Sequence, residues 1–165
     1  MNDIILGNLI SLLAMGSDSF SATRKTAKGV LLVQCISQFL YGLSSLVLKG
    51  YSAVVQSAVS IVRNLVAVKG EPSKATQWIL ILLGVALGLF FNNLGAVGWL
   101  PVISNLEYSI AVFRFKDNER GLKLAFLVNI ALFAIFNAVI YNFVGLIANV
   151  VIFATTVMAL VKTSG

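Results

Sequence analysis

The chain has 165 residues, of which 59% are hydrophobic and 11% charged, and its formal net charge is +6. A soluble domain is usually about 45–50% apolar and about 25% charged, so this composition excludes a soluble globular protein and predicts a bundle of membrane-spanning helices. The cationic residues stand between apolar segments, which is typical of membrane topology signals and argues against nucleic-acid binding. At about 20 residues per span, the length holds six or seven spans.

The first half of the chain predicts three spans. The first covers residues 4–22 and is weakly apolar, and the residues before it carry an acid rather than the positive region of a signal peptide, so we expect it to be retained. A basic loop, 23–29, separates it from the second span, 30–48. The return 49–51 is so short that the third span, 52–68, must be its antiparallel neighbour.

A fourth span follows a break at residues 69–74, which contain both glycine and proline. This span covers residues 75–94 and carries Gly84 and Gly88 four positions apart. Small residues at this spacing allow helices to approach closely in membranes. We therefore expect a close helix contact at this pair of glycines.

Three further spans complete the chain. Trp99 reads as an interfacial anchor before the fifth span, 100–115, and Pro101 is predicted in its first turn. The most charged stretch leads into the sixth span, 124–141, and a second tight return leads into the seventh, 146–161.

The positive charges predict the orientation of these seven spans. With the N-terminus outside and the C-terminus inside, Lys49 is the one cation in the outside loops, and Arg63 lies within a span near its inner end. Such an asymmetry is strong evidence for orientation. The cations that fall on the cytoplasmic side are Arg24, Lys25, Lys28, Lys69, Lys74, Arg114, Lys116, Arg120, Lys123 and Lys162.

An internal repeat is predicted when the chain is aligned with itself at a distance of 95 residues. Gln34 then falls on Asn129 and Gly50 on Gly145, and the basic loops also correspond. An odd span between two repeats leaves them parallel in the membrane. We therefore predict a three-helix unit over residues 1–69, a linker helix over 70–97 and a second three-helix unit over 98–165.

Several short patterns resemble the YgjV-type bacterial inner-membrane proteins. These patterns are Gln34-x-x-Ser37, Tyr41, Gly50-Tyr51, Arg63-Asn64 and Tyr141-Asn142 before Gly145. That family is similar to the SWEET, PQ-loop and PnuC transporters, which are built as three helices, one linker helix and three helices.

The resemblance implies alternating access for a small solute such as a sugar, an amino acid or a vitamin nucleoside. The chain departs from the PQ-loop pattern, because it has no Pro-Gln dipeptide and has Leu6 in the place that corresponds to Pro101. This departure argues against a symmetric proline-hinged motion.

Amide side chains within the spans are the candidate solute-binding groups. They must face protein or water, because lipid offers them no hydrogen-bond partner. Each offers both a donor and an acceptor, which suits a neutral, hydroxyl-rich solute. The alternative is that they only join helices, at about 0.6 kcal/mol per hydrogen bond. The predicted substrate-binding residues are Gln34, Gln38, Gln56, Arg63, Asn64, Asn129, Asn137 and Asn149.

Apart from Arg114 at the end of the fifth span, three charged residues lie within the spans. Arg63 has three alternatives: its side chain extends to the cytoplasmic surface, pairs with Asp18 or binds an anionic group. Glu107, beside Tyr108, and Asp18 are candidate protonatable groups, with facilitated diffusion as the default.

The sequence thus predicts an all-α inner-membrane protein that passes a small polar solute, such as a sugar, nucleoside or vitamin-like compound, by alternating access. The alternative is a non-transporting scaffold or partner subunit. The chain has no histidine, its Cys35 is alone and no carboxylate pair has a usable spacing, so we expect no enzymatic activity, cofactor or metal. The expected partners are the lipid bilayer and the solute, and a homo-oligomer is compatible with this pattern.

Overall fold

Helices make up the fold of the computed structural model, which describes residues 2–21, 27–70, 72–114 and 119–162. These ranges contain seven α-helices, one 3₁₀ helix and no strand, so the predicted all-α class is confirmed. Each predicted span corresponds to one α-helix. The helices are α1 (Asn2–Ser21), α2 (Ala27–Val47), α3 (Tyr51–Lys69), α4 (Lys74–Phe90), η1 (Gly95–Gly98), α5 (Trp99–Arg114), α6 (Glu119–Val139) and α7 (Phe143–Lys162).

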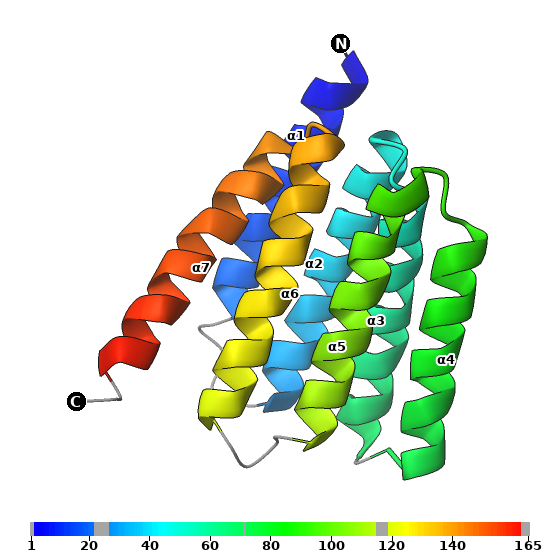
Figure 1. Ribbon diagram of the computed structural model, residues 1–165, viewed down its shortest axis with the longest axis vertical. Helices are drawn as coiled ribbons and strands as arrows, with labels where there is room; N and C mark the ends of the chain where they lie inside the picture. The colour runs from blue at the N-terminus through cyan, green and yellow to red at the C-terminus, as the bar shows by residue number, and fades with distance from the viewer. Residues whose placement is uncertain (1, 22–26, 71, 115–118, 163–165) are drawn as a thin grey trace.

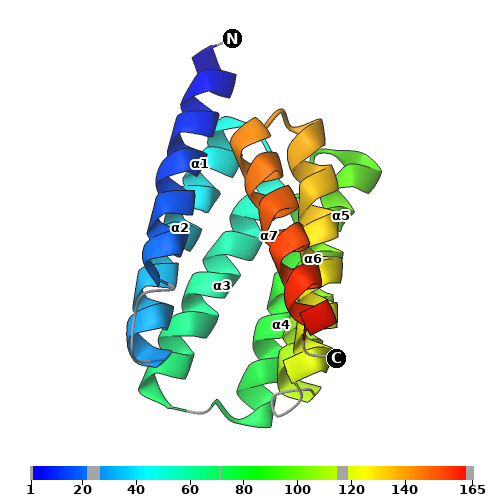
Figure 2. The same cartoon turned by 90° about the vertical axis from the view of Figure 1, so that its left-hand side faces the viewer.

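Six of the helices close into a ring. Helices α1, α2 and α3 pack in sequence, and so do α5, α6 and α7 (Figure 1). Contacts between α3 and α5 and between α1 and α7 join the two groups into what we call the six-helix ring. Helix α4 lies outside this ring, against α3 and α5 (Figures 1 and 2).

The surface of the bundle is apolar and its interior is partly polar. Large apolar side chains are exposed around the bundle, among them Leu13 at 64% and Phe90 at 80%. The side chains of Ser11, Ser37 and Ser104 are fully buried. Soluble proteins place these residue types the other way round. The distribution therefore matches a protein whose surroundings are lipid.

Helix α3 is, within the described ranges, the one helix that is both long enough and apolar enough to cross a membrane by itself. The shorter apolar stretches are Leu31–Val47, Lys74–Phe90, Lys123–Val139 and Phe143–Met158. These stretches are apolar but shorter than α3, so they differ from it in length rather than in apolar character.

The predicted close approach at Gly84 and Gly88 is present between α4 and α3. A Cβ atom at Gly84 would lie 3.3 Å from Val59 Cγ1, and one at Gly88 would collide with the Gln56 amide and lie 2.7 Å from Val102 Cγ2. The two glycines therefore make room for the side chain of Gln56. Pro101 lies in the first turn of α5, as predicted, and is fully buried.

Two tight turns, α2–α3 and α6–α7, have the same backbone geometry. Lys49 and Tyr141 both have a φ of 60°, and equivalent bonds run from Gly50 N to Ser45 O (2.7 Å) and from Asn142 N to Asn137 O (2.9 Å). The turns therefore correspond at a distance of 92 residues, not at the predicted 95. The sequence alignment paired two glycines, whereas the positive φ that fixes each turn belongs to the residue before Gly50 and before Asn142.

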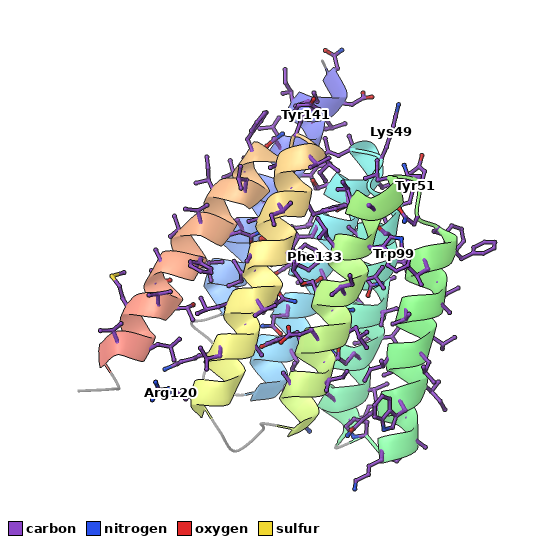
Figure 3. All side chains as sticks on the ribbon, viewed as in Figure 1. Lys49, Tyr51, Trp99, Arg120, Phe133 and Tyr141 are labelled. Carbon is purple, nitrogen blue, oxygen red and sulfur yellow. The ribbon has the colours of Figure 1, made fainter. Side chains whose placement is uncertain are left out.

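An apolar cluster closes the bundle beneath these turns. Figure 3 shows Lys49 and Tyr141 at the end that holds the N-terminus, which we call the upper end, and Arg120 at the opposite, lower end. The cluster, which we call the apolar plug, consists of Ala53, Phe136 and Ile140 with Leu48, Leu94, Val97, Leu100 and Phe133 packed against them.

Candidate functional site: a polar cavity within the ring

A cavity of about 410 Å³ lies inside the six-helix ring, and every ring helix lines it. Three of its lining residues, Ala53, Phe133 and Phe136, also belong to the apolar plug, and Asn142 and Gly145 at the α6–α7 turn line it as well, so the cavity extends up to the plug and this turn. Small-molecule sites usually measure about 300–1,000 Å³. The cavity is therefore large enough for a metabolite.

All eight residues predicted to bind solute line this single cavity. Asp18 lines it as well, whereas Glu107 does not. The residues come from four helices of the ring, in both halves of the chain. The eight are Gln34, Gln38, Gln56, Arg63, Asn64, Asn129, Asn137 and Asn149.

Four of these amides retain hydrogen-bonding groups that no protein atom uses. The side chains of Gln34, Gln38 and Asn64 make no hydrogen bond within the described part of the chain, and Asn149 Nδ2 is buried without a partner there. A buried polar group without a partner costs about 1–3 kcal/mol. These four side chains are therefore the best placed to bind water or a solute.

Two other amides line the cavity and also join helices. Asn129 Nδ2 donates to the carbonyl oxygen of Ser104 on α5 at 3.1 Å, and Ser104 Oγ donates to the Asn129 carbonyl at 3.1 Å. Asn142 Nδ2 donates to Asn137 Oδ1 at 3.2 Å, which braces the α6–α7 turn. These residues therefore hold the wall in place.

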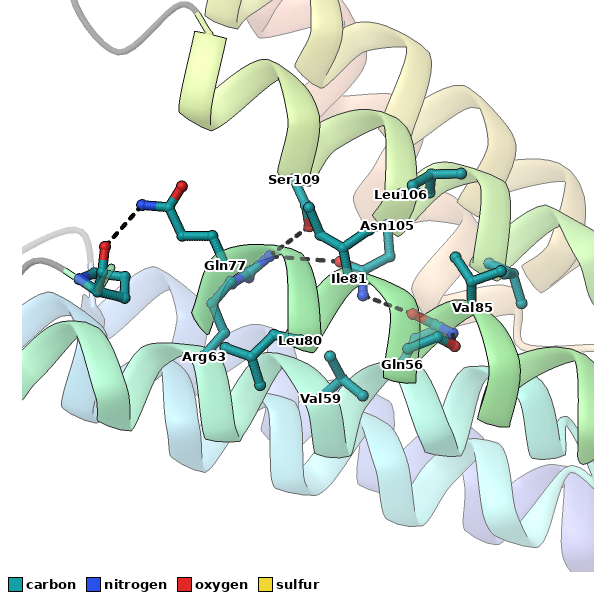
Figure 4. A pocket seen from close by; sticks show the side chains of 13 residues that line it. Gln56, Val59, Arg63, Gln77, Leu80, Ile81, Val85, Asn105, Leu106 and Ser109 are labelled. Carbon is teal, nitrogen blue, oxygen red and sulfur yellow. Dashed lines mark hydrogen bonds between the residues drawn. The ribbon is translucent and has the colours of Figure 1, made fainter. Parts of the chain in front are cut away.

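A hydrogen-bonded network ties α4 to the ring (Figure 4). Gln56 Nε2 donates to the Gly84 carbonyl oxygen at 2.8 Å, and Gln56 Oε1 accepts from Asn105 Nδ2 at 2.6 Å. Both ends of the Gln56 amide are thus already used. Arg63 Nη1 extends the network with long bonds to Asn105 Oδ1 (3.5 Å) and Ser109 Oγ (3.4 Å).

The alternative in which Arg63 pairs with Asp18 is wrong. The hydrogen bonds of Arg63 go to α5, whereas the carboxyl group of Asp18 lies beside Ser37 and Tyr41 of α2. The reason is the order of the helices, because α1 packs on α2 and α7 while α3 packs on α5. The two charged groups therefore line the same cavity from different sides.

The cavity has one polar wall and one apolar wall. Helices α2 and α3 contribute the polar wall, with Gln34, Gln38, Tyr41, Ser45, Ser57, Ser60 and Asn64. Helix α6 contributes most of the apolar lining, which we call the apolar wall: Phe126, Ile130, Phe133 and Phe136, interrupted by the amides of Asn129 and Asn137. Phe133 lies at mid-height of the bundle (Figure 3). At the 92-residue distance of the turns, Gln34 corresponds to Phe126 and Gln38 to Ile130. The site thus suits a solute with a polar and an apolar side.

Glu107 lies on the outer side of α5. Ile103 and Ile110, about one turn away on either side of it, are exposed, and Glu107 Oε2 is buried without a hydrogen-bond partner in the described part of the chain. Its position separates it from the groups that a solute in the cavity would contact. Its protonatable role stays a prediction.

Two asparagines that the sequence analysis did not select hold the upper end together. Asn8 Nδ2 donates to the Tyr141 carbonyl at 2.8 Å and Asn8 Oδ1 accepts from Val144 N at 2.9 Å. Asn93 Nδ2 donates to the Lys49 carbonyl at 2.7 Å and Asn93 Oδ1 accepts from Tyr51 N at 3.3 Å.

We call these two sets of bonds the asparagine clamps. Asn8 on α1 clamps the turn between α6 and α7, and Asn93, just before α5, clamps the turn between α2 and α3. The turn of the second three-helix group is thus held by the first group, and the turn of the first group is held by the loop between α4 and η1. Their partners are backbone carbonyl and N–H groups, so no pattern of residue types predicts them.

Comparison with known proteins gives one match. A family model described as bacterial inner membrane protein matches residues 5–165 of the chain. No curated protein and no solved structure matches it. The match covers all seven helices and the whole lining of the cavity.

Proposed function

Since the chain belongs to the Imp-YgjV family of bacterial inner membrane proteins, we propose that it carries a small polar solute across that membrane through its cavity. The observation that carries this proposal is the cavity of about 410 Å³. It lies inside a membrane protein, collects polar side chains from both halves of the chain and leaves four amides with unused hydrogen-bonding groups. Intramembrane polar groups are expensive and usually mark a solute pathway.

The proposed architecture is two three-helix units joined by a linker helix. Helices α1 to α3 form the first unit, α4 is the linker and α5 to α7 form the second. The matching turns and the asparagine clamps support this internal repeat. The position of α4 outside the ring is the one expected of a linker.

The proposed orientation places the lower end in the cytoplasm. Lys28, Lys69, Lys74 and Arg120 lie in or next to helix ends at the lower end, whereas Lys49 lies at the upper end. Cytoplasmic loops carry an excess of cationic residues. Of the other cations used for this prediction, Arg24, Lys25 and Lys116 lie outside the described residues.

Alternating access requires one end to be closed while the other is open. The apolar plug and the asparagine clamps close the upper end. Helices α1 and α7 diverge toward the lower end (Figure 2), and Ile152 of α7 both lines the cavity and is 37% exposed. These features fit an inward-facing state, from which the upper end would open as the clamps release.

The test is uptake into proteoliposomes that contain the purified protein. A panel of sugars, nucleosides and vitamin-like compounds, each with neutral and acidic members, identifies the solute. Gln38→Leu and Asn64→Leu should then lower uptake about three- to tenfold, because each removes a hydrogen bond of about 0.5–1.5 kcal/mol to the solute.

Gln77→Leu is the matched control, because this amide lies on α4 and bonds to the Pro72 carbonyl rather than lining the large cavity. It should leave uptake unchanged, and thermal unfolding should show that all three variants are folded. Equal uptake by the wild type and both cavity variants would refute the assignment of the cavity as the pathway.

A second candidate is a non-transporting scaffold. It is favoured by the helix-to-helix bonds of Gln56 and Asn129, which show that part of the amide set serves packing. A scaffold predicts that none of the panel enters the vesicles above the rate of empty liposomes.

A further inference from the structure

We propose that the transported solute carries a single carboxylate-type anionic group, which Arg63 binds at one side of the cavity. This inference rests on the proposed transport function and narrows the class of solute. The class would include sugar acids and carboxylate-bearing, vitamin-like compounds. The inference starts from the state of the Arg63 side chain.

Arg63 is the one cation among the described residues that line the cavity. A guanidinium has five N–H donors on three nitrogens. In this structure only Nη1 makes hydrogen bonds, and both are long bonds to neutral acceptors, Asn105 Oδ1 at 3.5 Å and Ser109 Oγ at 3.4 Å. Most of its donors are therefore available to a group in the cavity.

A carboxylate matches the unused donors of the Arg63 guanidinium in charge and in shape. Its two oxygens can accept a parallel pair of guanidinium hydrogen bonds, which are among the strongest in proteins. An unpaired cation within a membrane protein is costly, and a bound anion would offset this cost. Asn64, the next residue along α3, also lines the cavity with an unused amide.

One negative charge fits better than two. No second cation lines the cavity among the described residues, and Asp18 lines another side of it, beside Ser37 and Tyr41. A dianionic phosphate would leave one charge without a cation and would face the carboxylate of Asp18. The monoanionic carboxylate needs only Arg63.

The rest of the solute would lie against the apolar wall. Phe126, Ile130, Phe133 and Phe136 offer ring and aliphatic surface but no hydrogen-bonding side chain. Gln34 and Gln38 face the cavity from α2 with unused amides. An organic acid with a partly apolar body would satisfy Arg63, the amides and this wall together.

Arginine modification by phenylglyoxal, read by mass spectrometry on the full-length protein in liposomes, tests the inference. The probes are acetate and benzoate, matched with the neutral compounds acetamide and benzamide. Arg120, which is exposed at the lower end (Figure 3), is the control within the same molecule. At a probe concentration about ten times its Kd, we expect each carboxylate to slow modification of Arg63 about tenfold, because only about a tenth of the sites stay free, and to leave Arg120 unaffected.

Three results would overturn the inference: no modification of Arg63, no protection by either carboxylate, or equal protection by carboxylates and carboxamides. Binding of the same probes, measured by thermal shift, adds a second readout. Stabilisation by benzoate should be lost in Arg63→Gln and kept in Arg120→Gln, and its loss or retention in both variants would count against Arg63.

The outcome is separable from that of the transport proposal. If neutral solutes enter proteoliposomes and carboxylates do not protect Arg63, the carboxylate assignment fails and transport stands. If carboxylates protect Arg63 but no solute enters, the anion site stands and the transport proposal fails.

Discussion

At the scale of single residues, the interior of this bundle depends on where side chains are absent as much as on where polar ones are present. Gln56 can bond to both α4 and α5 only because Gly84 and Gly88 leave room for its amide. A methyl group at Gly88 would overlap that amide and crowd Val102. The packing of α4 thus depends on the absence of a side chain at Gly84 and at Gly88.

Gly88→Ala should therefore lower the free energy of unfolding by about 1–3 kcal/mol, the usual cost of overpacking a tight contact. Gly16→Ala is the matched control, because a Cβ atom there would meet nothing within 4 Å. Alanine in place of a helical glycine should make that control more stable by about 0.5–1 kcal/mol. Chemical denaturation in detergent measures both, and a Gly88→Ala protein as stable as the wild type would contradict the close packing.

The charges of the cavity are also fixed at this scale. The sequence left open whether Arg63 pairs with Asp18. The order of helices around the ring separates them, because Asn105 and Ser109 of α5 take the Arg63 side chain. Its partners lie more than 40 residues away on α5, and spacing along the chain does not predict such a contact.

At the scale of elements, each of the two tight turns is held by an asparagine from outside its own three-helix group. In each turn, the asparagine clamp uses the carbonyl group of the residue with positive φ and an N–H group two or three residues later. Four clamp bonds of about 0.5–1.5 kcal/mol each give the upper end a modest closing energy. This energy is small enough for thermal motion or solute binding to overcome.

Asn93→Ala should accordingly loosen the α2–α3 turn. Amide hydrogen exchange of Tyr51 should become about three- to tenfold faster, because the change removes a bond of about 0.5–1.5 kcal/mol. Asn8→Ala should have the same effect on Val144 in the α6–α7 turn.

Asn92→Ala is the control for these variants. The Asn92 side chain bonds only within its own loop, to Gly95 O and Leu94 N. It should alter exchange at Leu94 and leave Tyr51 unchanged. If exchange at Tyr51 is the same in the wild type and Asn93→Ala, the clamp does not hold the turn.

At the scale of the whole molecule, the sequence predicts the helices and the lining of the cavity better than it predicts how the helices contact one another. The apolar runs and the breaks at glycine, proline and charge gave each helix to within a few residues. The eight candidate residues line one cavity because polar side chains in membrane-spanning helices turn away from lipid and toward the interior of the bundle.

The contacts between helices were harder to predict, for a physical reason. The repeat distance of 95 residues rested on pairing Gly50 with Gly145, whereas the turns correspond at 92 through their backbone torsions. The clamps join side chains to backbone carbonyl and N–H groups, which do not depend on residue type. The location of Glu107 away from the cavity depends on the rotation of α5 about its axis. None of these features has a signature in residue types.

Access to the cavity from both faces of the membrane tests the central proposal most directly. A cysteine at Ser57, which lines the cavity, is placed in a Cys35→Ala background and exposed to a membrane-impermeant maleimide in right-side-out and inside-out vesicles. Alternating access predicts labelling from both sides, with faster labelling from the lower, cytoplasmic end and an increase in outside labelling when Asn8 and Asn93 are both changed to alanine. Labelling from one side only, unchanged by loss of both clamps, would contradict it.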